Sequence, residues 1–132
     1  MIRICFVILS LIPAISAGVL APRAQAADSV TYEVVSNDVA TANVEYFDLS
    51  QRKVLDGVQL PWRTNVTVID AHSPSTDGAE VRADWRSSIA ALPVWRPGKW
   101  VTVRIYFQGK VICQNTLDVG NAACYGSTTF KN

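Results

Sequence analysis

The stretch Trp100-Val101-Thr102-Val103-Arg104-Ile105-Tyr106-Phe107 decides the fold of this chain. Its branched and apolar residues recur at every second position, and Thr102, Arg104 and Tyr106 fill the positions between them. Because successive side chains of an extended chain point to opposite faces, this alternation predicts a strand that buries one face and exposes the other. We expect this strand to lie near the centre of a sheet.

The residues on either side of this stretch carry the signals of further strands. Gln108-Gly109 supplies a glycine for a tight turn into residues 110–116, which predicts a hairpin. The same alternation recurs upstream in residues 30–34, 42–46, 65–68 and 81–86, and a short last strand is expected around Cys124 to Phe130. Turn-forming residues lie at 36–38, 56–57, 77–78 and 96–98. This spacing predicts an all-β fold, a single antiparallel β-sandwich of about seven strands with immunoglobulin-like architecture.

The amino-acid composition agrees with this prediction. Residues 27–132 contain 15 valines and nine threonines but only five leucines and no methionine. Branched side chains fit a pleated surface better than a helical turn, so we expect almost no helix. One stretch, Ser87 to Pro97, does not follow the alternation, and its pattern allows either a single turn of helix or an apolar connection between the sheets.

The first 26 residues predict an export segment. Arg3 provides a positive start, residues 4–21 form an apolar run, and Ala24-Gln25-Ala26 is a small-residue cleavage signature. The run has about 18 residues, which is at the lower edge of the length that spans a bilayer. Residues 1–26 are therefore either a signal peptide removed before Ala27 or an N-terminal membrane anchor, and the cleavage signature favours removal. Residues 27–132 are the expected extracytoplasmic domain.

The cysteines predict one disulfide. Cys5 lies within the leader, which leaves Cys113 and Cys124 as a pair in the exported domain. In an oxidising compartment an even pair of cysteines indicates a bridge. A structural zinc site would need four ligands, and these two cysteines make only half of one. We therefore expect a disulfide between Cys113 and Cys124, and no metal site.

The charge balance and the residue types exclude several classes of protein. Without Arg3 and Arg23 of the leader, the formal charge of +1 becomes −1, which leaves no field to attract nucleic acid. The single histidine, His72, lies in a loop-forming stretch, and no serine sits in a Gly-x-Ser-x-Gly elbow. Acidic residues such as Asp38 and Asp77 occupy turn positions, where a short carboxylate caps the backbone. We therefore expect no catalytic residues and no cofactor.

Aromatic residues give the strongest indication of a contact surface. Trp95-Arg96-Pro97-Gly98-Lys99-Trp100 places two indoles and two cations around a Pro-Gly turn. Tryptophan and arginine are favoured where a small surface must bind a partner, so Trp95, Arg96, Lys99 and Trp100 are the candidate contact residues. The competing interpretation is that both indoles close one end of the core and the cations are solvated.

A long ordered combination of residues lies in the first half of the domain. It consists of Val30-Thr31-Tyr32-Glu33-Val34, Ala42-Asn43-Val44-Glu45-Tyr46-Phe47-Asp48 and Val54-Leu55-Asp56-Gly57-Val58-Gln59-Leu60-Pro61-Trp62. These segments resemble the extracytoplasmic domain of the mycobacterial MmpS family, and the resemblance extends over residues 30–70. The second half keeps a similar order of strong strand, glycine turn, strand and late cysteine. It departs from the family pattern at Val103, where the family places its first cysteine.

The resemblance carries expectations about function. MmpS proteins are small membrane-associated accessory proteins of RND-type MmpL exporters. The resemblance implies a β-sandwich on the outer face of the cytoplasmic membrane, a non-enzymatic adaptor for the export of siderophores or complex lipids. Its expected partner is an RND-type transporter or a lipid-like cargo. A freely secreted binding module is the alternative, and a small hydrolase with an acid pair in a cleft is a third hypothesis.

Overall fold

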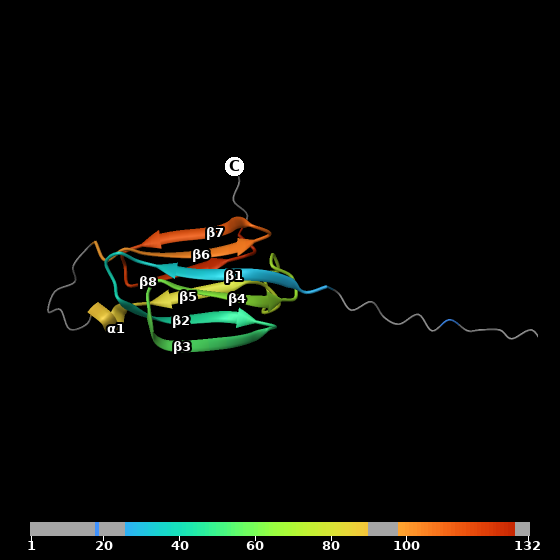
Figure 1. The fold of residues 1–132 in the computed structure, drawn as a ribbon, viewed down its shortest axis with the longest axis horizontal. Coiled ribbons are helices and arrows are strands. Elements are labelled where there is room, and N and C mark those ends of the chain that lie inside the picture. The colour runs from blue at the N-terminus through green and yellow to red at the C-terminus, as the bar shows by residue number, and fades with distance from the viewer. Residues whose placement is uncertain (1–17, 19–25, 90–97, 129–132) are drawn as a thin grey trace, which may run out of the picture.

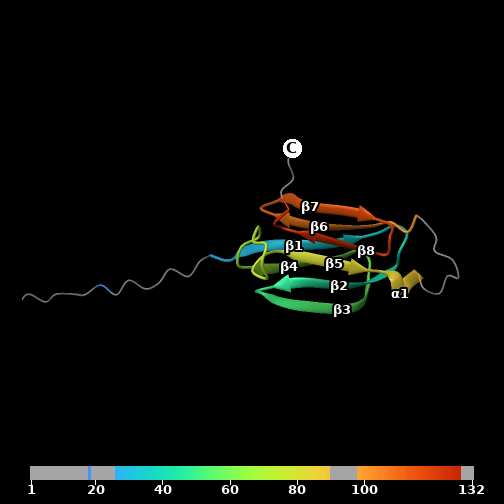
Figure 2. The same ribbon diagram turned by 180° about the vertical axis from the view of Figure 1, so that it is seen from behind.

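The computed structural model describes Gly18, residues 26–89 and residues 98–128. These residues form β1 (Asp28–Val35), β2 (Thr41–Asp48), β3 (Gln51–Gln59), β4 (Trp62–Val68), β5 (Glu80–Asp84), the helical turn α1 (Arg86–Ile89), β6 (Val101–Phe107), β7 (Lys110–Leu117) and β8 (Asn121–Tyr125). Two four-stranded antiparallel sheets, ordered β4-β1-β6-β7 and β3-β2-β5-β8, pack against each other (Figure 1, Figure 2). The predicted all-β sandwich is confirmed, with eight strands in place of about seven.

β6 contains the stretch on which the fold prediction depends. It lies inside its sheet, between β1 and β7, as expected. Val101, Val103 and Ile105 are fully buried, whereas Arg104 on the opposite face is only partly buried. The Gln108-Gly109 turn returns the chain as β7, and both turn residues have positive φ angles, 51° and 75°. The predicted hairpin is therefore confirmed.

β3 is the strand that the sequence pattern does not predict. The expected turn at Asp56-Gly57 is wrong, because these two residues form a bulge inside β3. Gly57 has a φ of 62°, and its N–H donates to the side-chain oxygen of Asn43 on β2 at 2.9 Å. The pairing shifts there, so that Ala42 faces Val58 and Val44 faces Leu55. Asp56 and Gly57 are therefore part of β3, which continues through them as an edge strand.

Two other boundaries differ from the expected ones. β8 ends at Tyr125, before the predicted limit at Phe130, which lies outside the described residues. Gly126 packs so closely against the loop before β5 that a Cβ atom there would lie 1.9 Å from the carbonyl oxygen of Ala71. The stretch Ser87 to Pro97 begins within α1, and residues 90–97 lie outside the described residues.

Tyr32 links the two sheets through polar contacts inside the core. Its hydroxyl donates to the carbonyl oxygen of Phe47 on β2 at 2.7 Å and accepts from the N–H of Glu80 on β5 at 3.3 Å. The side chain is fully buried, and burial raises the pKa of its hydroxyl. Because buried polar groups are costly when unpaired, these two bonds favour one alignment of the sheets.

The predicted disulfide is confirmed. Cys113 of β7 and Cys124 of β8 are bonded, so the bridge joins the edge strands of the two sheets on one side of the sandwich. On the same side, the side-chain amide of Asn115 donates to the carbonyl oxygen of Ala123 at 2.8 Å. This side of the sandwich is therefore closed by covalent and polar contacts between β7 and β8.

The sandwich has two distinct ends. We refer to the end where β1 begins as the Asp28 end, and to the opposite end, which carries α1, as the α1 end (Figure 1). The turns β2–β3 and β6–β7 and the loop β4–β5 lie at the Asp28 end, and the connections β1–β2, β3–β4 and β7–β8 lie at the α1 end. An eight-residue strand spans about 26 Å, which sets the scale of the distance between the ends.

Candidate functional site

Only the last three residues of the predicted contact segment 95–100 belong to the part of the chain that the structure describes. Lys99 and Trp100 lie at the α1 end, immediately before β6, whereas Trp95 and Arg96 lie outside the described residues. Trp100 is 47% exposed, so its indole is not a core residue. The interpretation that places both indoles in the core therefore does not hold for Trp100. Its role as a contact residue stays a prediction.

The backbone of Trp100 is held by the loop between β1 and β2. Its N–H donates to the carboxylate of Asp38 at 3.3 Å, and its carbonyl oxygen accepts from the Ser36 hydroxyl at 2.6 Å. The Ser36 oxygen also accepts from the N–H groups of Asp38 and Val39 at 3.0 and 2.9 Å. An exposed indole on such a fixed backbone loses little conformational freedom when it binds.

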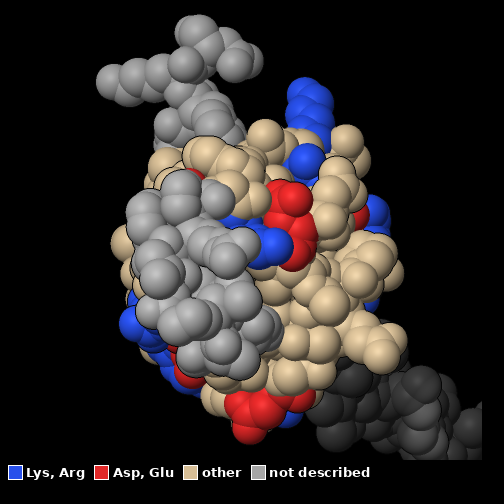
Figure 3. All heavy atoms as spheres, turned by 90° about the vertical axis from the view of Figure 1, so that its left-hand side faces the viewer, with Lys and Arg blue, Asp and Glu red and all other residues tan. Residues whose placement is uncertain are grey.

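A second exposed apolar side chain lies at the same end. Val119, in the loop between β7 and β8, is 55% exposed. A hydrogen bond joins this loop to the residues before β6. The N–H of Gly98 donates to the carboxylate of Asp118, the residue before Val119, at 3.3 Å. We refer to Lys99, Trp100, Asp118 and Val119 as the α1-end patch. Figure 3 looks onto this end, and the described residues visible there are mostly uncharged, with a few basic and acidic side chains among them.

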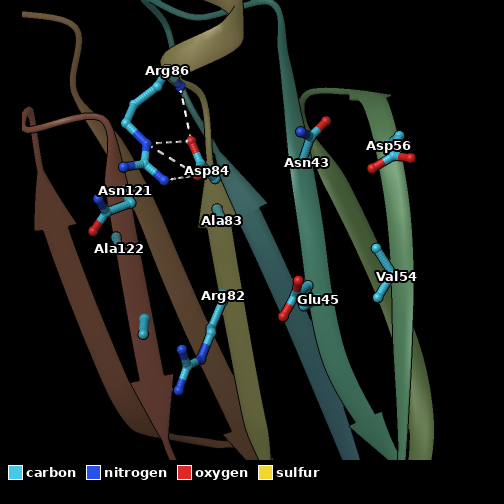
Figure 4. Close-up of a pocket in the computed structure, with 11 residues that line it drawn as sticks. Asn43, Glu45, Val54, Asp56, Arg82, Ala83, Asp84, Arg86, Asn121 and Ala122 are labelled. Atoms are coloured by element: carbon cyan, nitrogen blue, oxygen red, sulfur yellow. Dashed lines mark hydrogen bonds and ion pairs between the residues drawn. The ribbon is translucent and has the colours of Figure 1, made fainter.

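A shallow hollow lies beside this end, on the outer face of the sheet β3-β2-β5-β8 (Figure 4). It is lined by residues from four strands and α1, namely Asn43, Glu45, Val54, Asp56, Arg82, Ala83, Asp84, Arg86, Asn121, Ala122 and Ala123. Arg86 chelates the carboxylate of Asp84 through its Nε, at 3.0 and 3.1 Å, and through its Nη2. Gly120 allows this placement, since a Cβ there would lie 2.6 Å from the Cγ of Arg86.

Four of the five charged side chains that line the hollow, Glu45, Arg82, Asp84 and Arg86, form ion pairs within the protein. Arg86 holds the pKa of Asp84 below its usual range, and Glu45 forms an ion pair with Arg52 at 2.9 Å. A general acid for glycoside hydrolysis needs a raised pKa, which Asp84 does not have. The strand pairing that brings Asn43 opposite Asp84 could not be predicted, because alternation gives the face of each residue but not its neighbour.

The outer face of the other sheet carries a charged network centred on Glu33. Its carboxylate accepts from Arg104 at 2.8 Å, from Arg63 at 3.0 Å and from the Tyr106 hydroxyl at 3.1 Å. Partial burial alone would raise the pKa of Glu33, but these three donors together lower it. Arg63 also lies over the ring of Tyr106, with 5.0 Å to the centroid. The network therefore joins β4, β1 and β6.

This network predicts how stability depends on pH. The pKa of Glu33 is lower in the folded state than in the unfolded chain. The ionised carboxylate therefore contributes to the free energy of unfolding at pH values above its unfolded pKa, and this contribution is lost as the pH falls through its folded pKa. We expect Glu33→Gln to lower the free energy of unfolding by about 1–2 kcal/mol at pH 7. Urea unfolding at pH 7 and pH 3 measures this, and the gap between the two proteins should shrink at pH 3. A gap that stays constant would contradict the role of the ionised carboxylate.

Two kinds of feature are absent from the described residues. In the ranges 26–89 and 98–128, no group of three or more His, Cys, Asp or Glu side chains is placed to hold a metal ion. No helix in the described part of the chain is long and apolar enough to cross a bilayer.

Comparison with known proteins identifies the family. No curated protein matches the chain. A family model described as Mycobacterium membrane protein matches residues 9–81, which is more than half of the chain and runs from the apolar leader into β5. The match includes the residues on which the resemblance depends, and the chain therefore belongs to the MmpS-type family of mycobacterial membrane proteins.

Proposed function

We propose that this protein is an anchored, non-enzymatic accessory protein of an RND-type exporter of lipids or siderophores. The observation that carries the proposal is the family match, which begins at residue 9, inside the apolar run of the leader. A family defined over both the leader and the β-sandwich favours a leader that stays with the domain. On this proposal residues 1–26 hold the sandwich at the outer face of the cytoplasmic membrane.

The position of the α1-end patch supports a partner at some distance from the membrane. The apolar run ends at Ala21 and β1 begins at Asp28, so the Asp28 end lies close to the anchor. Trp100 and Val119 lie at the opposite end of the sandwich. An anchored domain would therefore direct the patch toward the extracytoplasmic part of a transporter.

The chemistry of the patch suits a protein partner. Trp100 and Val119 offer apolar area, and Lys99 and Asp118 provide charges of both signs beside it. An apolar centre with a polar rim is the usual arrangement of a small protein interface. Because the backbone of Trp100 is already fixed, its indole has the properties of an interface anchor.

Replacement of Trp100 tests this role. We expect Trp100→Ala to weaken binding to the co-expressed RND transporter about thirtyfold, the equivalent of about 2 kcal/mol for an aromatic anchor. The midpoint of thermal unfolding should change little, because the side chain is half exposed. The measurements are affinity by titration of the full-length protein in detergent, and cargo export in a deletion strain complemented with each variant.

A matched variant controls for loss of any exposed aromatic side chain. Tyr125 is exposed at the Asp28 end, so Tyr125→Ala should bind the transporter like the native protein. If Trp100→Ala binds and complements fully, the α1-end patch is not the contact surface.

The secreted binding module is the second candidate, and the cleavage signature Ala24-Gln25-Ala26 favours it. The two functions differ in the fate of the leader. N-terminal sequencing of protein from membranes and culture medium should recover the leader on the membrane-bound form. Chains that begin at Ala27 and occur only in the medium would instead support the secreted module.

A further inference from the structure

We propose that the Asp28 end of the sandwich rests on the membrane through two exposed apolar side chains, Leu49 and Ile69, and that their partner is the lipid surface. This inference rests on the proposed function, because it requires residues 1–26 to stay in the membrane as an anchor. It assigns the two ends of the sandwich to different partners.

The first of these side chains lies at the tip of the β2–β3 hairpin. Leu49 and Ser50 form a two-residue turn with φ angles of 46° and 64°. Glycine, asparagine and aspartate are preferred at such positions, because larger side chains crowd the backbone there. Leu49 is nevertheless 52% exposed, so no core contact explains a large apolar residue at the tip. Positive φ at a non-glycine residue is often tolerated for a functional reason.

The tip is held in place by neighbouring strands. The N–H of Leu49 donates to the carbonyl oxygen of Thr67 on β4 at 2.8 Å. The Ser50 hydroxyl donates to the carboxylate of Asp77 in the loop before β5 at 2.6 Å. Leu49 is therefore presented on a fixed backbone.

The second side chain lies beside the first. Ile69 follows Val68, which pairs with Asp28, and it lies two residues after the Thr67 carbonyl that binds Leu49. Its N–H donates to the carbonyl oxygen of Asp77 at 3.1 Å, and its side chain is 38% exposed. Leu49 and Ile69 thus lie level with the first residue of β1, at the same end of the sandwich.

The length of the connecting segment places this end near the membrane. Six residues, 22–27, lie between Ala21, the end of the apolar run, and Asp28. A chain of this length reaches roughly 25 Å at most when fully extended. An anchored domain therefore keeps Leu49 and Ile69 within reach of the bilayer at high effective concentration, so that even a small apolar contact becomes populated.

The surrounding charges determine which lipid surface is favoured. Asp28, Asp70 and Asp77 lie around Ile69, and their carboxylates accept from the Ala71 N–H, the His72 N–H and the Ser50 hydroxyl respectively. Three carboxylates next to the contact would be repelled by anionic headgroups within a Debye length. The contact should therefore be closer on zwitterionic phosphatidylcholine than on a surface rich in phosphatidylglycerol.

Depth-dependent quenching in vesicles tests the proposal. The full-length protein with Cys5→Ser is reconstituted in phosphatidylcholine vesicles that contain lipids brominated near the headgroup. A fluorophore is attached at Leu49→Cys or, as the matched control, at Val119→Cys; native Cys113 and Cys124 are bonded and do not react. We expect at least threefold stronger quenching at position 49 than at position 119, and a decrease at position 49 when phosphatidylglycerol is added.

A second pair of variants shows that the apolar side chain itself makes the contact. With the fluorophore at Ile69→Cys, the substitution Leu49→Asn should halve the quenching or reduce it further, because asparagine keeps the turn conformation but removes the apolar group. Val119→Asn should leave the quenching at position 69 unchanged.

The outcomes separate the contact from the anchor. Equal quenching at positions 49 and 119, in protein that floats with the vesicles, would overturn the lipid contact and leave the anchored function standing. Protein that does not float with the vesicles would overturn the anchor and with it the contact. Quenching at position 49 that appears only after addition of the RND transporter would also overturn the proposal, since it would make the transporter the partner of this end.

Discussion

Removal of the Cys113–Cys124 disulfide is expected to lower the free energy of unfolding of the domain by about 3 kcal/mol. The bridge joins residues 11 positions apart and closes the chain between them into a loop. This loop reduces the number of conformations open to the unfolded chain, which stabilises the folded state. It also cross-links the edge strands of two different sheets. For a domain of this size, such a loss is a large share of the total stability.

Chemical unfolding in guanidinium chloride measures this effect. The midpoint should fall when the native protein is reduced, and the double variant Cys113→Ala, Cys124→Ala should behave like the reduced protein. Asn115→Ala is the matched control, because it removes only the hydrogen bond to Ala123 on the same side of the sandwich. That variant should lose about 1 kcal/mol. Equal midpoints for oxidised and reduced protein would show that the bridge does not stabilise the fold.

The parts of the fold that the sequence predicts are those that depend on local pattern. The alternation of Val101, Val103 and Ile105 indicates a half-buried strand wherever that strand pairs, so β6 could be recognised without any knowledge of its neighbours. The disulfide could also be predicted, because only two cysteines, Cys113 and Cys124, lie outside the predicted leader. The strand could be predicted from a short segment, and the disulfide from the number of cysteines.

The parts that could not be predicted depend on contacts between distant segments. Asp56-Gly57 has the composition of a turn, and it forms a bulge because β3 pairs with β2 on both sides of it with a shift in register opposite Asn43. The hollow beside α1 requires β2 and β8 on either side of β5, which is a property of the sheet order. Local residue types do not determine either feature.

The tryptophans illustrate the same limit. The alternation in residues 81–86 puts Trp85 on the same face as Val81 and Ala83, and all three are buried. Trp100 also lies just outside a strand, immediately before β6, but it is half exposed. Whether a tryptophan at the end of a strand is covered depends on the loops that surround it. The sequence alone could not decide this for Trp100.

The largest loss of stability is expected for Trp85→Ala, about 3–5 kcal/mol. Trp85 is fully buried at the α1 end, and its removal would leave a cavity among the valines and alanines of the core. Its Nε1 has no hydrogen-bond partner among the described residues, so Trp85→Phe should lose less, because it fills much of the same space without burying an unpaired N–H.

The comparison of Trp85→Ala with Trp100→Ala distinguishes a core tryptophan from a surface one. Thermal and urea unfolding of both variants should show a large loss for Trp85→Ala and a change within about 0.5 kcal/mol for Trp100→Ala. Binding to the transporter should show the reverse order when it is measured at a temperature where both variants are folded. Equal destabilisation by the two substitutions would mean that Trp100 belongs to the core in solution, and its assignment to the α1-end patch would be wrong.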